Sequence, residues 1–343
     1  MNKKIAMLGC GSIGSSISAD LTKAGYDITI FDQWPAQVEA LKAAGLHIQM
    51  PDGDLKISVR AHHLCELASL NMEFDIVFLA VKSYDSRWMA ELIKPYLKNS
   101  GVLVPTQSGM NNDAIDSIIG GGRTLGCALE LSAAIFTPGL VQRNITRENT
   151  WFAVGEPDGS YTERVREIQS ILNNVGRCDV TGNIFGAKWT KLIANTMTAG
   201  PHGLLGLKNC EAAVLPGMFD ISLNLGRESL AVGVASGYRV DPLFGLRADE
   251  VAGDDDNVLT TIVKTLVRHL GSRSRTAPIH DHIKGRRGEI DYINGVVVRK
   301  GRELGIPTPY NDAVVEIDRL INTRQVEMDP SNFELLKSKL NLK

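Results

Sequence analysis

The sequence lacks any apolar run long enough to cross a membrane. Its 343 residues contain no stretch approaching the roughly 20 uninterrupted apolar residues that a transmembrane helix requires. The first apolar run, residues 5–8, is also too short for the core of a signal peptide, and glycines follow it at once. We therefore expect a protein that has no membrane partner.

Cysteine usage and charge exclude further classes of protein. Five cysteines are scattered along the chain without a CxxC pair, which is typical of a reducing cytoplasm and argues against a disulfide framework or a zinc ribbon. The 37 lysines and arginines are balanced by 39 aspartates and glutamates, so no basic field exists to attract nucleic acid. We expect a cytoplasmic enzyme with neither a metal site nor a nucleic-acid partner.

Short apolar runs alternate with helical patterns in the first half of the chain. The runs that read as buried strands are residues 4–8, 27–31, 76–80 and 102–105. Strands that alternate with helices predict a doubly wound parallel sheet of the Rossmann type. The runs 125–135 and 151–154 are expected to be later strands of the same sheet.

From about Phe185 the strand patterns give way to helical ones. The predicted helices lie at residues 189–197, 221–234, 258–270, 290–298 and 313–321. The length of the chain also favours two domains of about 150 residues each. We therefore divide the chain into a dinucleotide-binding Rossmann domain, residues 1–182, and an all-helical domain, residues 183–343.

A GxGxxG pattern lies directly after the first strand and before the first helix. In that context the first glycine permits a tight turn, the second lets the backbone approach a pyrophosphate, and the third allows close helix–strand packing. The N-terminus of the helix offers N–H groups to the phosphates. The residues expected to bind the cofactor here are Gly9, Cys10, Gly11, Ser12, Ile13 and Gly14.

Asp32 follows the second strand, where a carboxylate accepts hydrogen bonds from the adenosine ribose. A carboxylate repels a 2′-phosphate, and the neighbouring Gln33 supplies no cation to offset that repulsion. The sequence therefore favours NAD(H), with NADP(H) as the alternative cofactor. The competing interpretation is that Asp32 only caps the helix that begins near Pro35.

A lysine and an amide share one side of the first predicted helix of the second domain. Lys191 and Asn195 are four residues apart, with Lys188 one turn earlier, while Trp189 is expected to anchor the opposite face. Such a pair can protonate a developing alkoxide and orient a substrate oxygen. A solvated polar face is the competing interpretation.

Three segments together resemble the ketopantoate reductase (2-dehydropantoate 2-reductase) family. They are the GxGxxG loop, the run Lys188-Trp-Thr-Lys-Leu-Ile-Ala-Asn195, and the run Gly288-Glu-Ile-Asp-Tyr-Ile-Asn-Gly295. The resemblance implies a Rossmann domain followed by an all-α domain of the 6-phosphogluconate dehydrogenase-like type, the reduction of a 2-keto acid by a nicotinamide cofactor, and a homodimer. The β-hydroxyacid dehydrogenases also place a lysine and an asparagine on this helix, but the Glu289 segment favours ketopantoate reductase.

The resemblance also implies roles for individual residues. Lys191 matches the general acid of the family, Asn195 an active-site amide, and Glu289 a carboxylate that positions the substrate. Lys82 matches a lysine near the cofactor, and Ser108 stands where the family has an asparagine beside the nicotinamide.

Other departures from the family pattern concern the substrate. Ala277 replaces a serine that contacts substrate, and Ala199 replaces a second asparagine on the catalytic helix. Glu130 either compensates for these losses or is a strand residue on a solvent face. We expect an NAD-linked 2-keto acid reductase, or 2-hydroxy acid dehydrogenase in reverse, whose substrate need not be ketopantoate. The alternatives are a true 2-dehydropantoate 2-reductase of pantothenate biosynthesis and a non-catalytic NAD(H) sensor.

Overall fold

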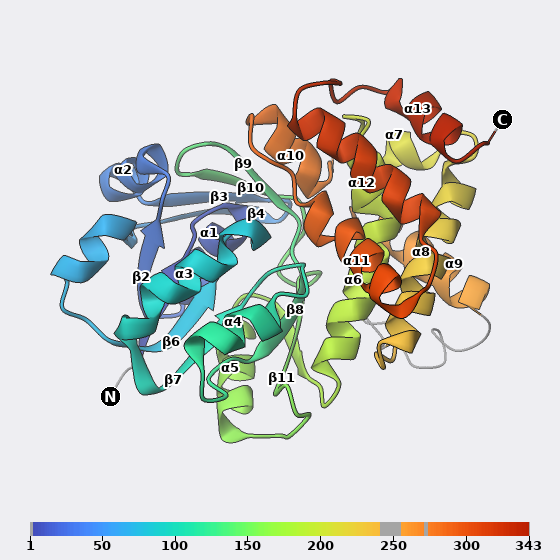
Figure 1. Cartoon of the computed structure of the whole chain (residues 1–343). Helices are drawn as coiled ribbons and strands as arrows, with labels where there is room; N and C mark the ends of the chain where they lie inside the picture. Colours follow the sequence, from blue (N-terminus) through green and yellow to red (C-terminus); the bar gives the residue numbers. More distant parts are fainter. Residues whose placement is uncertain (1–2, 241–254, 271–273, 343) are drawn as a thin grey trace. The chain divides into compact units, whose positions relative to one another are not determined.

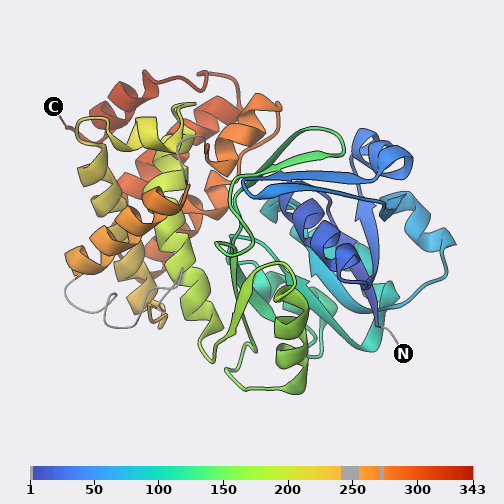
Figure 2. The same ribbon diagram turned by 180° about the vertical axis from the view of Figure 1, so that it is seen from behind.

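The computed structural model describes residues 3–240, 255–270 and 274–342. The chain divides into two compact units, the first made of the residues up to 107 together with 111–184, the second of residues 108–110 together with 185–343. Figures 1 and 2 show the chain from opposite sides. Dinucleotide binding by residues 1–182 and substrate binding by residues 183–343 stay predictions.

A five-stranded parallel sheet forms the centre of the first unit, as the sequence predicted. Its strands, in spatial order, are β5 (Arg60–His63), β2 (Asp27–Asp32), β1 (Lys4–Leu8), β6 (Phe74–Leu79) and β7 (Leu97–Pro105). The connecting helices include α1 (Ser12–Lys23), α2 (Pro35–Ala44), α3 (Ser86–Ile93) and α4 (Asn112–Ile119). The order in which β1 lies between β2 and β6 brings the loops that follow these three strands to one edge of the sheet.

Both faces of this sheet are buried, because successive strand residues point to opposite sides. On β1, Ile5 and Met7 join one hydrophobic core, whereas Ala6 and Leu8 join another. The first core includes residues of α1 and α5 (Glu163–Leu172), and the second includes residues of α3 and α4. Figure 1 shows α3 and α4 on one side of the sheet, and Figure 2 shows α1 and α5 on the other.

The prediction that residues 125–135 and 151–154 extend the same sheet is wrong. A three-stranded sheet contains β12 (Arg177–Val180), β11 (Trp151–Gly155) and β8 (Gly126–Glu130), and a separate four-stranded sheet contains β4 (Gly53–Ile57), β3 (Leu46–Met50), β10 (Leu140–Arg143) and β9 (Ala133–Thr137). One parallel bridge joins Leu103 to Thr124, after which β8 pairs with β11 in antiparallel fashion. Apolar runs indicate that strands form, but not which strands they pair with.

The second unit is helical, as predicted. Among the residues that the structure describes, its helices are α6 (Ile184–Gly203), α7 (Asn209–Ala213), α8 (Met218–Ala235), α9 (Asp255–Leu270), α10 (Ala277–Ile283), α11 (Asn294–Leu304), α12 (Pro309–Asn322) and α13 (Asn332–Lys339). The single helix predicted over 290–298 is divided into a 3-10 turn (Ile290–Tyr292) and α11, because the backbone of Ile293 leaves the helical region. None of the helices in the described ranges combines the length and apolar character that a membrane span needs.

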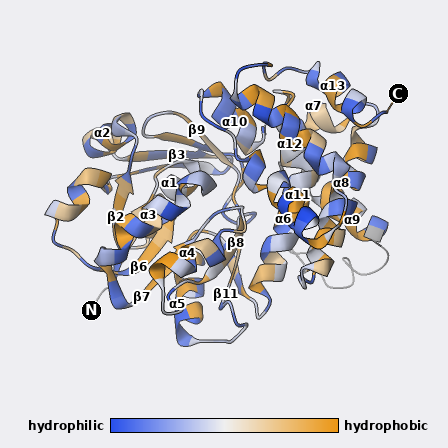
Figure 3. Cartoon of the chain, in the orientation of Figure 1, coloured by the Kyte–Doolittle hydropathy of each residue, from blue (hydrophilic) through white to orange (hydrophobic). Residues whose placement is uncertain are grey.

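Tight contacts fix α6 against α8. The indole Nε1 of Trp189 donates a hydrogen bond to the carbonyl oxygen of Ser229, at 3.0 Å. Gly233 lies so close that an added Cβ would be 2.0 Å from that nitrogen. Figure 3 shows the alternation of hydrophobic and hydrophilic residues along the helices of this unit. The face of α6 that carries Trp189 is therefore locked in the core, which sets the direction of its other side chains.

A buried ion pair holds α1 to β10 in the first unit. The Asp20 carboxylate lies 2.7 Å from Nη1 of Arg143, whose side chain is fully buried, and it also pairs with Arg147. Arg143 donates further hydrogen bonds to Thr150 and to the carbonyl oxygen of Val175. Burial lowers the pKa of Arg143 and the Asp20 charge opposes that shift. Loss of the carboxylate would leave a desolvated cation without its main partner.

We expect Asp20→Ala to reduce the free energy of unfolding by about 3–5 kcal/mol, the cost of leaving one member of a buried pair behind. Urea denaturation measures this change. The control is Asp54→Ala, because Asp54 is exposed and pairs with His47 at the surface, and we expect a loss within about 0.5 kcal/mol there. A loss below about 1 kcal/mol for Asp20→Ala would contradict this role for the pair.

Candidate active site

The backbone between β1 and α1 requires glycine at two of its three glycine positions. Gly9 has a φ of +90°, and a Cβ there would lie 2.8 Å from Cγ1 of Val81. A Cβ on Gly14 would lie 2.0 Å from the carbonyl oxygen of Gly9. The strand–turn–helix packing therefore accounts for Gly9 and Gly14 without any ligand.

Gly11 is different, because nothing in the fold requires it to lack a side chain. Its φ is −67°, and an added Cβ would meet no atom within 4 Å. It is the N-cap of α1, and no side chain caps this end of the helix. The first N–H groups of a helix have no acceptor within the helix, and they favour an anion. An uncapped helix N-terminus with open space beside it is compatible with the pyrophosphate of a dinucleotide, and the cofactor role of the loop stays a prediction.

Two buried side chains brace this loop from behind. Ser15 Oγ and Gln37 Nε2 both donate to the carbonyl oxygen of Cys10, at 3.0 and 3.1 Å, and Gln37 Oε1 accepts the N–H of Gly139. Burial, assisted by the charge of Asp32, raises the pKa of the Cys10 thiol to about 12. Cys10 therefore contributes backbone groups to the loop. The sequence analysis did not identify Gln37. The feature that could have revealed it is its position as a polar residue among the buried apolar residues of α2.

Asp32 is tied to the loop by its own carboxylate. Oδ2 accepts the N–H of Cys10, and Oδ1 accepts the N–H of Trp34 at 2.7 Å. The alternative prediction, in which Asp32 caps α2, is wrong, because the N-cap is Trp34 and the carboxylate bonds the backbone of that residue. The ribose role stays a prediction.

The loop after β6 lies at the same edge of the sheet. Lys82 is half-buried and precedes a 3-10 turn, Ser83–Asp85. Gln107 holds this loop by donating from Nε2 to the carbonyl oxygen of Val81 and to Oγ of Ser86, both at 2.7 Å. The structure therefore brings residues 9–14, Asp32 and Lys82 together at the carboxyl ends of β1, β2 and β6.

Asp85, which sequence reasoning did not single out, faces the residue beside Asp32. Its Oδ2 accepts a hydrogen bond of 2.9 Å from Nε2 of Gln33, and its Oδ1 accepts one of 2.8 Å from Nε1 of Trp88. Gln33 therefore has one carboxylate next to it in the chain, Asp32, and a second, Asp85, bonded to its side chain. The hydrogen bond joins residues 52 positions apart, and only the fold reveals it.

The two lysines of α6 are withdrawn from water. Lys191 is 7% exposed and Lys188 is 2% exposed, while Asn195 is half-buried. The alternative prediction of a solvated polar face is therefore wrong. Because Trp189 anchors the opposite side of the helix, Lys191 and Asn195 share a direction, one turn apart. The arrangement presents an ammonium and an amide side by side.

Glu289 lies in the second unit just before the 3-10 turn that leads to α11. It is half-buried, and Ile290, which follows it, is fully buried in the helical core. Nδ2 of Asn294, in the same segment, donates to the carbonyl oxygen of Thr196, the residue after Asn195. The 288–295 segment therefore packs on α6 close to the predicted catalytic amide.

The positions that depart from the family pattern range from buried to exposed. Glu130 is buried on β8, opposite Trp151 of β11, so the prediction of a solvent-facing strand residue is wrong. Ser108 is exposed and belongs to the second unit. Ala277 is the exposed first residue of α10, and Ala199 is half-buried on α6, four residues beyond Asn195.

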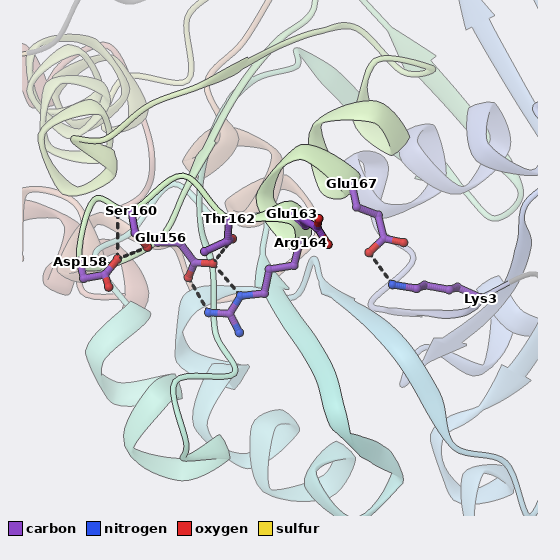
Figure 4. A pocket seen from close by; sticks show the side chains of 8 residues that line it. All are labelled: Lys3, Glu156, Asp158, Ser160, Thr162, Glu163, Arg164 and Glu167. Carbon is purple, nitrogen blue, oxygen red and sulfur yellow. Dashed lines mark hydrogen bonds and ion pairs between the residues drawn. The ribbon is translucent and has the colours of Figure 1, made fainter.

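A pocket of about 820 Å³ lies elsewhere, at the start of α5 (Figure 4). It contains none of the predicted site residues. Its main carboxylates are paired: Glu156 accepts hydrogen bonds from Arg164 and Thr162, and Glu167 pairs with Lys3. Within the described ranges, no three His, Cys, Asp or Glu side chains are grouped so that they could hold a metal ion.

Comparison with known proteins identifies the family. The model described as "Ketopantoate reductase PanE/ApbA" matches residues 5–157, and the model of the C-terminal part of the same family matches residues 183–322. The 2-dehydropantoate 2-reductase of Archaeoglobus fulgidus is 25% identical over 324 residues, which cover 92% of this chain and 97% of the relative. That of Mesorhizobium japonicum is 27% identical over 340 residues, with the same two coverages.

Solved structures show the same fold. A PanE/ApbA family ketopantoate reductase from Ralstonia eutropha has a TM-score of 0.78 at 24% identity, covering 94% of this chain and 99% of that one. D-mandelate dehydrogenase with NADH and anilino(oxo)acetate has a TM-score of 0.81 at 18% identity, with the same coverages. The Rossmann-like first unit and the helical second unit are common to these proteins. The chain belongs to the ketopantoate reductase family and is an NAD(P)-dependent 2-keto acid reductase of that type.

Proposed function

We propose that this enzyme reduces a 2-keto acid with NADH, and that Lys191 is its general acid. The observation that carries the proposal is the buried ammonium of Lys191, one helical turn from the Asn195 amide, in a chain that belongs to this family. Burial withdraws this ammonium from water, and a proton donor for a carbonyl oxygen is the role that the family chemistry requires. This placement argues against a non-catalytic NAD(H) sensor.

Different residues bind the cofactor, donate the proton and orient the substrate. Residues 9–14, Asp32, Lys82 and Ser108 hold the cofactor, which supplies the hydride when it is bound. Lys191 donates a proton to the keto oxygen as the carbon is reduced, so that the carbonyl becomes a hydroxyl. Asn195 and Glu289 orient the substrate, which lowers the entropic part of the barrier.

The role of Lys191 is tested by Lys191→Ala. Because general acid catalysis contributes about 10²- to 10⁴-fold, we expect kcat to fall by that range while the Kd for NADH changes less than about threefold. The control is Lys264→Ala, since Lys264 is an exposed lysine of α9. Stopped-flow absorbance and NADH fluorescence give the two constants. An equal loss of turnover and NADH affinity, or no loss of either, would remove Lys191 from this role.

The glycine loop gives a second test, because its three glycines have different reasons to be glycine. We expect Gly11→Ala to lower the free energy of unfolding by no more than about 1 kcal/mol, the scale of an N-cap effect. The same variant should weaken NADH binding by at least about tenfold, or 1.4 kcal/mol. Gly14→Ala, by contrast, should destabilise the fold, because its Cβ would collide with Gly9. Isothermal titration of a Gly11→Ala variant that binds NADH as tightly as the wild type would overturn the proposed pyrophosphate site.

The preference for NAD over NADP rests on two carboxylates. Asp32 and Asp85 flank Gln33, and both would repel a 2′-phosphate. NADH is bound in the solved D-mandelate dehydrogenase, which shares this fold. An arginine introduced at position 33 would lie beside Asp85, because Gln33 is hydrogen-bonded to it. In the double variant D32A/Q33R, the Asp85 carboxylate would therefore compete with the 2′-phosphate for this arginine.

We expect D32A/Q33R to shift the ratio of kcat/KM for NADPH over NADH toward NADPH. The triple variant D32A/Q33R/D85N should shift it further, by about another tenfold, the value of one charge-assisted pair of roughly 1.4 kcal/mol. Asp113→Asn, on the exposed start of α4, is the control. An unchanged ratio in the double variant would remove Asp32 from the selection of the cofactor, and equal ratios in the two variants would do so for Asp85.

The substrate is proposed to differ from ketopantoate. Ala277 and Ala199 supply no hydrogen bond where the family pattern has a serine and an asparagine, and a lost polar partner changes discrimination by about 10⁴-fold in favourable cases. The D-mandelate dehydrogenase of the same fold shows that such a scaffold serves other 2-hydroxy acids. A panel of 2-keto acids, assayed by NADH absorbance, decides the matter. Ketopantoate as the best substrate would favour the alternative, a true 2-dehydropantoate 2-reductase of pantothenate synthesis.

We further propose a cytoplasmic homodimer. None of the five cysteines, all of them in the part of the chain that the structure describes, forms a disulfide, which suits a reducing compartment. The dimer is an expectation that comes from the family, and sedimentation equilibrium tests it.

A further inference from the structure

A chain of hydrogen bonds through three side chains leads to the backbone of the segment that carries Glu289. The N–H of Gly288 donates to Oδ1 of Asn322 at 3.0 Å, and Nδ2 of Asn322 donates to Oδ2 of Asp318 at 2.7 Å. The other carboxylate oxygen of Asp318 lies 3.2 Å from Nε2 of His282. These residues come from α10 and α12, so the chain of hydrogen bonds joins two helices to one backbone N–H.

The three side chains lie close to the backbone that they hold. Asp318 is 1% exposed, and the side chain of His282 is 6% exposed. A Cβ on Gly288 would lie 3.2 Å from Oδ1 of Asp318 and from Cε1 of His282, which is tighter than most Cβ contacts, so the backbone lies close against the pair. The packing leaves the backbone of Gly288 little freedom to shift.

Glu289 lies between two such points of attachment. On one side is the hydrogen bond from Gly288 to Asn322, and on the other is Ile290, which is fully buried with residues of α12 in the helical core. Its own carbonyl oxygen accepts the N–H of Tyr292 at 2.8 Å. The main chain on both sides of Glu289 is therefore fixed, and the direction of its side chain depends on these attachments.

We propose that Asn322, backed by Asp318 and His282, is a positioning residue that sets the orientation of the Glu289 carboxylate toward the substrate. This inference rests on the substrate-orienting role that the proposed function gives to Glu289. A displacement of about 1 Å in an orienting group costs up to about 10²-fold in rate. Asn322 acts only through Glu289, so its effect should vanish when the carboxylate is absent.

A double-mutant cycle with Asn322→Ala and Glu289→Gln tests the proposal. With the 2-keto acid turned over fastest in the panel, and NADH saturating, we expect Glu289→Gln to lower kcat/KM by about 10²-fold. Asn322→Ala should lower it by about tenfold in the wild type and by less than about twofold in the Glu289→Gln background. Hydrogen exchange of residues 285–292 should accelerate in Asn322→Ala. Gln325→Ala, an exposed change just beyond α12, is the control.

Conservative variants separate positioning from stability. Asp318→Asn keeps an acceptor for Asn322 and should retain most of the activity. Should Asn322→Ala fail to fold, the cycle is run with Asn322→Ser. The positioning role would be overturned if Asn322→Ala lowered kcat/KM equally in the wild-type and Glu289→Gln backgrounds. It would also be overturned if Asn322→Ala caused no loss of kcat/KM while Glu289→Gln did. Either result would leave the proposed function standing. Normal activity of Glu289→Gln would exclude both the orienting role of Glu289 and the positioning role of Asn322. In that case a loss of activity in Lys191→Ala would still support Lys191 as the general acid.

Discussion

The proposed chemistry requires a Lys191 ammonium that is withdrawn from water, on a helix that core packing holds in place. Trp189 is hydrogen-bonded to α8 and packed against Gly233, and these contacts fix the face of α6 that is turned to the core. Asn195 lies one turn along that face, and the 288–295 segment is hydrogen-bonded to the helix beside it. An ammonium held in this way keeps its direction without reorganisation during the reaction, which is the basis of electrostatic preorganisation.

The cofactor half depends on a different constraint, the close approach of backbone to backbone. Gly9 and Gly14 are needed for the turn itself, whereas Gly11 leaves room that the folded chain does not use. The carboxylate of Asp32 and the amide of Gln37 both hold Cys10, so the loop is shaped before any ligand arrives. Asp85 adds a second negative charge beside Gln33, and in the proposed function it would link the choice of cofactor to the loop after β6.

Local patterns in the sequence predicted four of the five strands of the central sheet, the glycine loop and the helix that carries Lys191, but not β5. Each of these depends on residues close together in the chain, such as the alternation of Ile5 and Ala6 between two cores. The pairing of β8 with β11, the break at Ile293 and the hydrogen bond from Gln33 to Asp85 depend on partners distant in sequence. A pattern within one segment carries no information about such partners.

A crystal structure of the enzyme with NADH and a non-reducible 2-keto acid analogue would show where the Lys191 ammonium lies relative to the substrate. We expect Nζ of Lys191 within hydrogen-bond distance, about 2.7–3.2 Å, of the oxygen that stands for the keto group. We also expect the dinucleotide pyrophosphate at the first turn of α1. An Nζ that points into bulk solvent, or that lies far from the analogue while another side chain contacts the keto oxygen, would show that Lys191 is not the general acid.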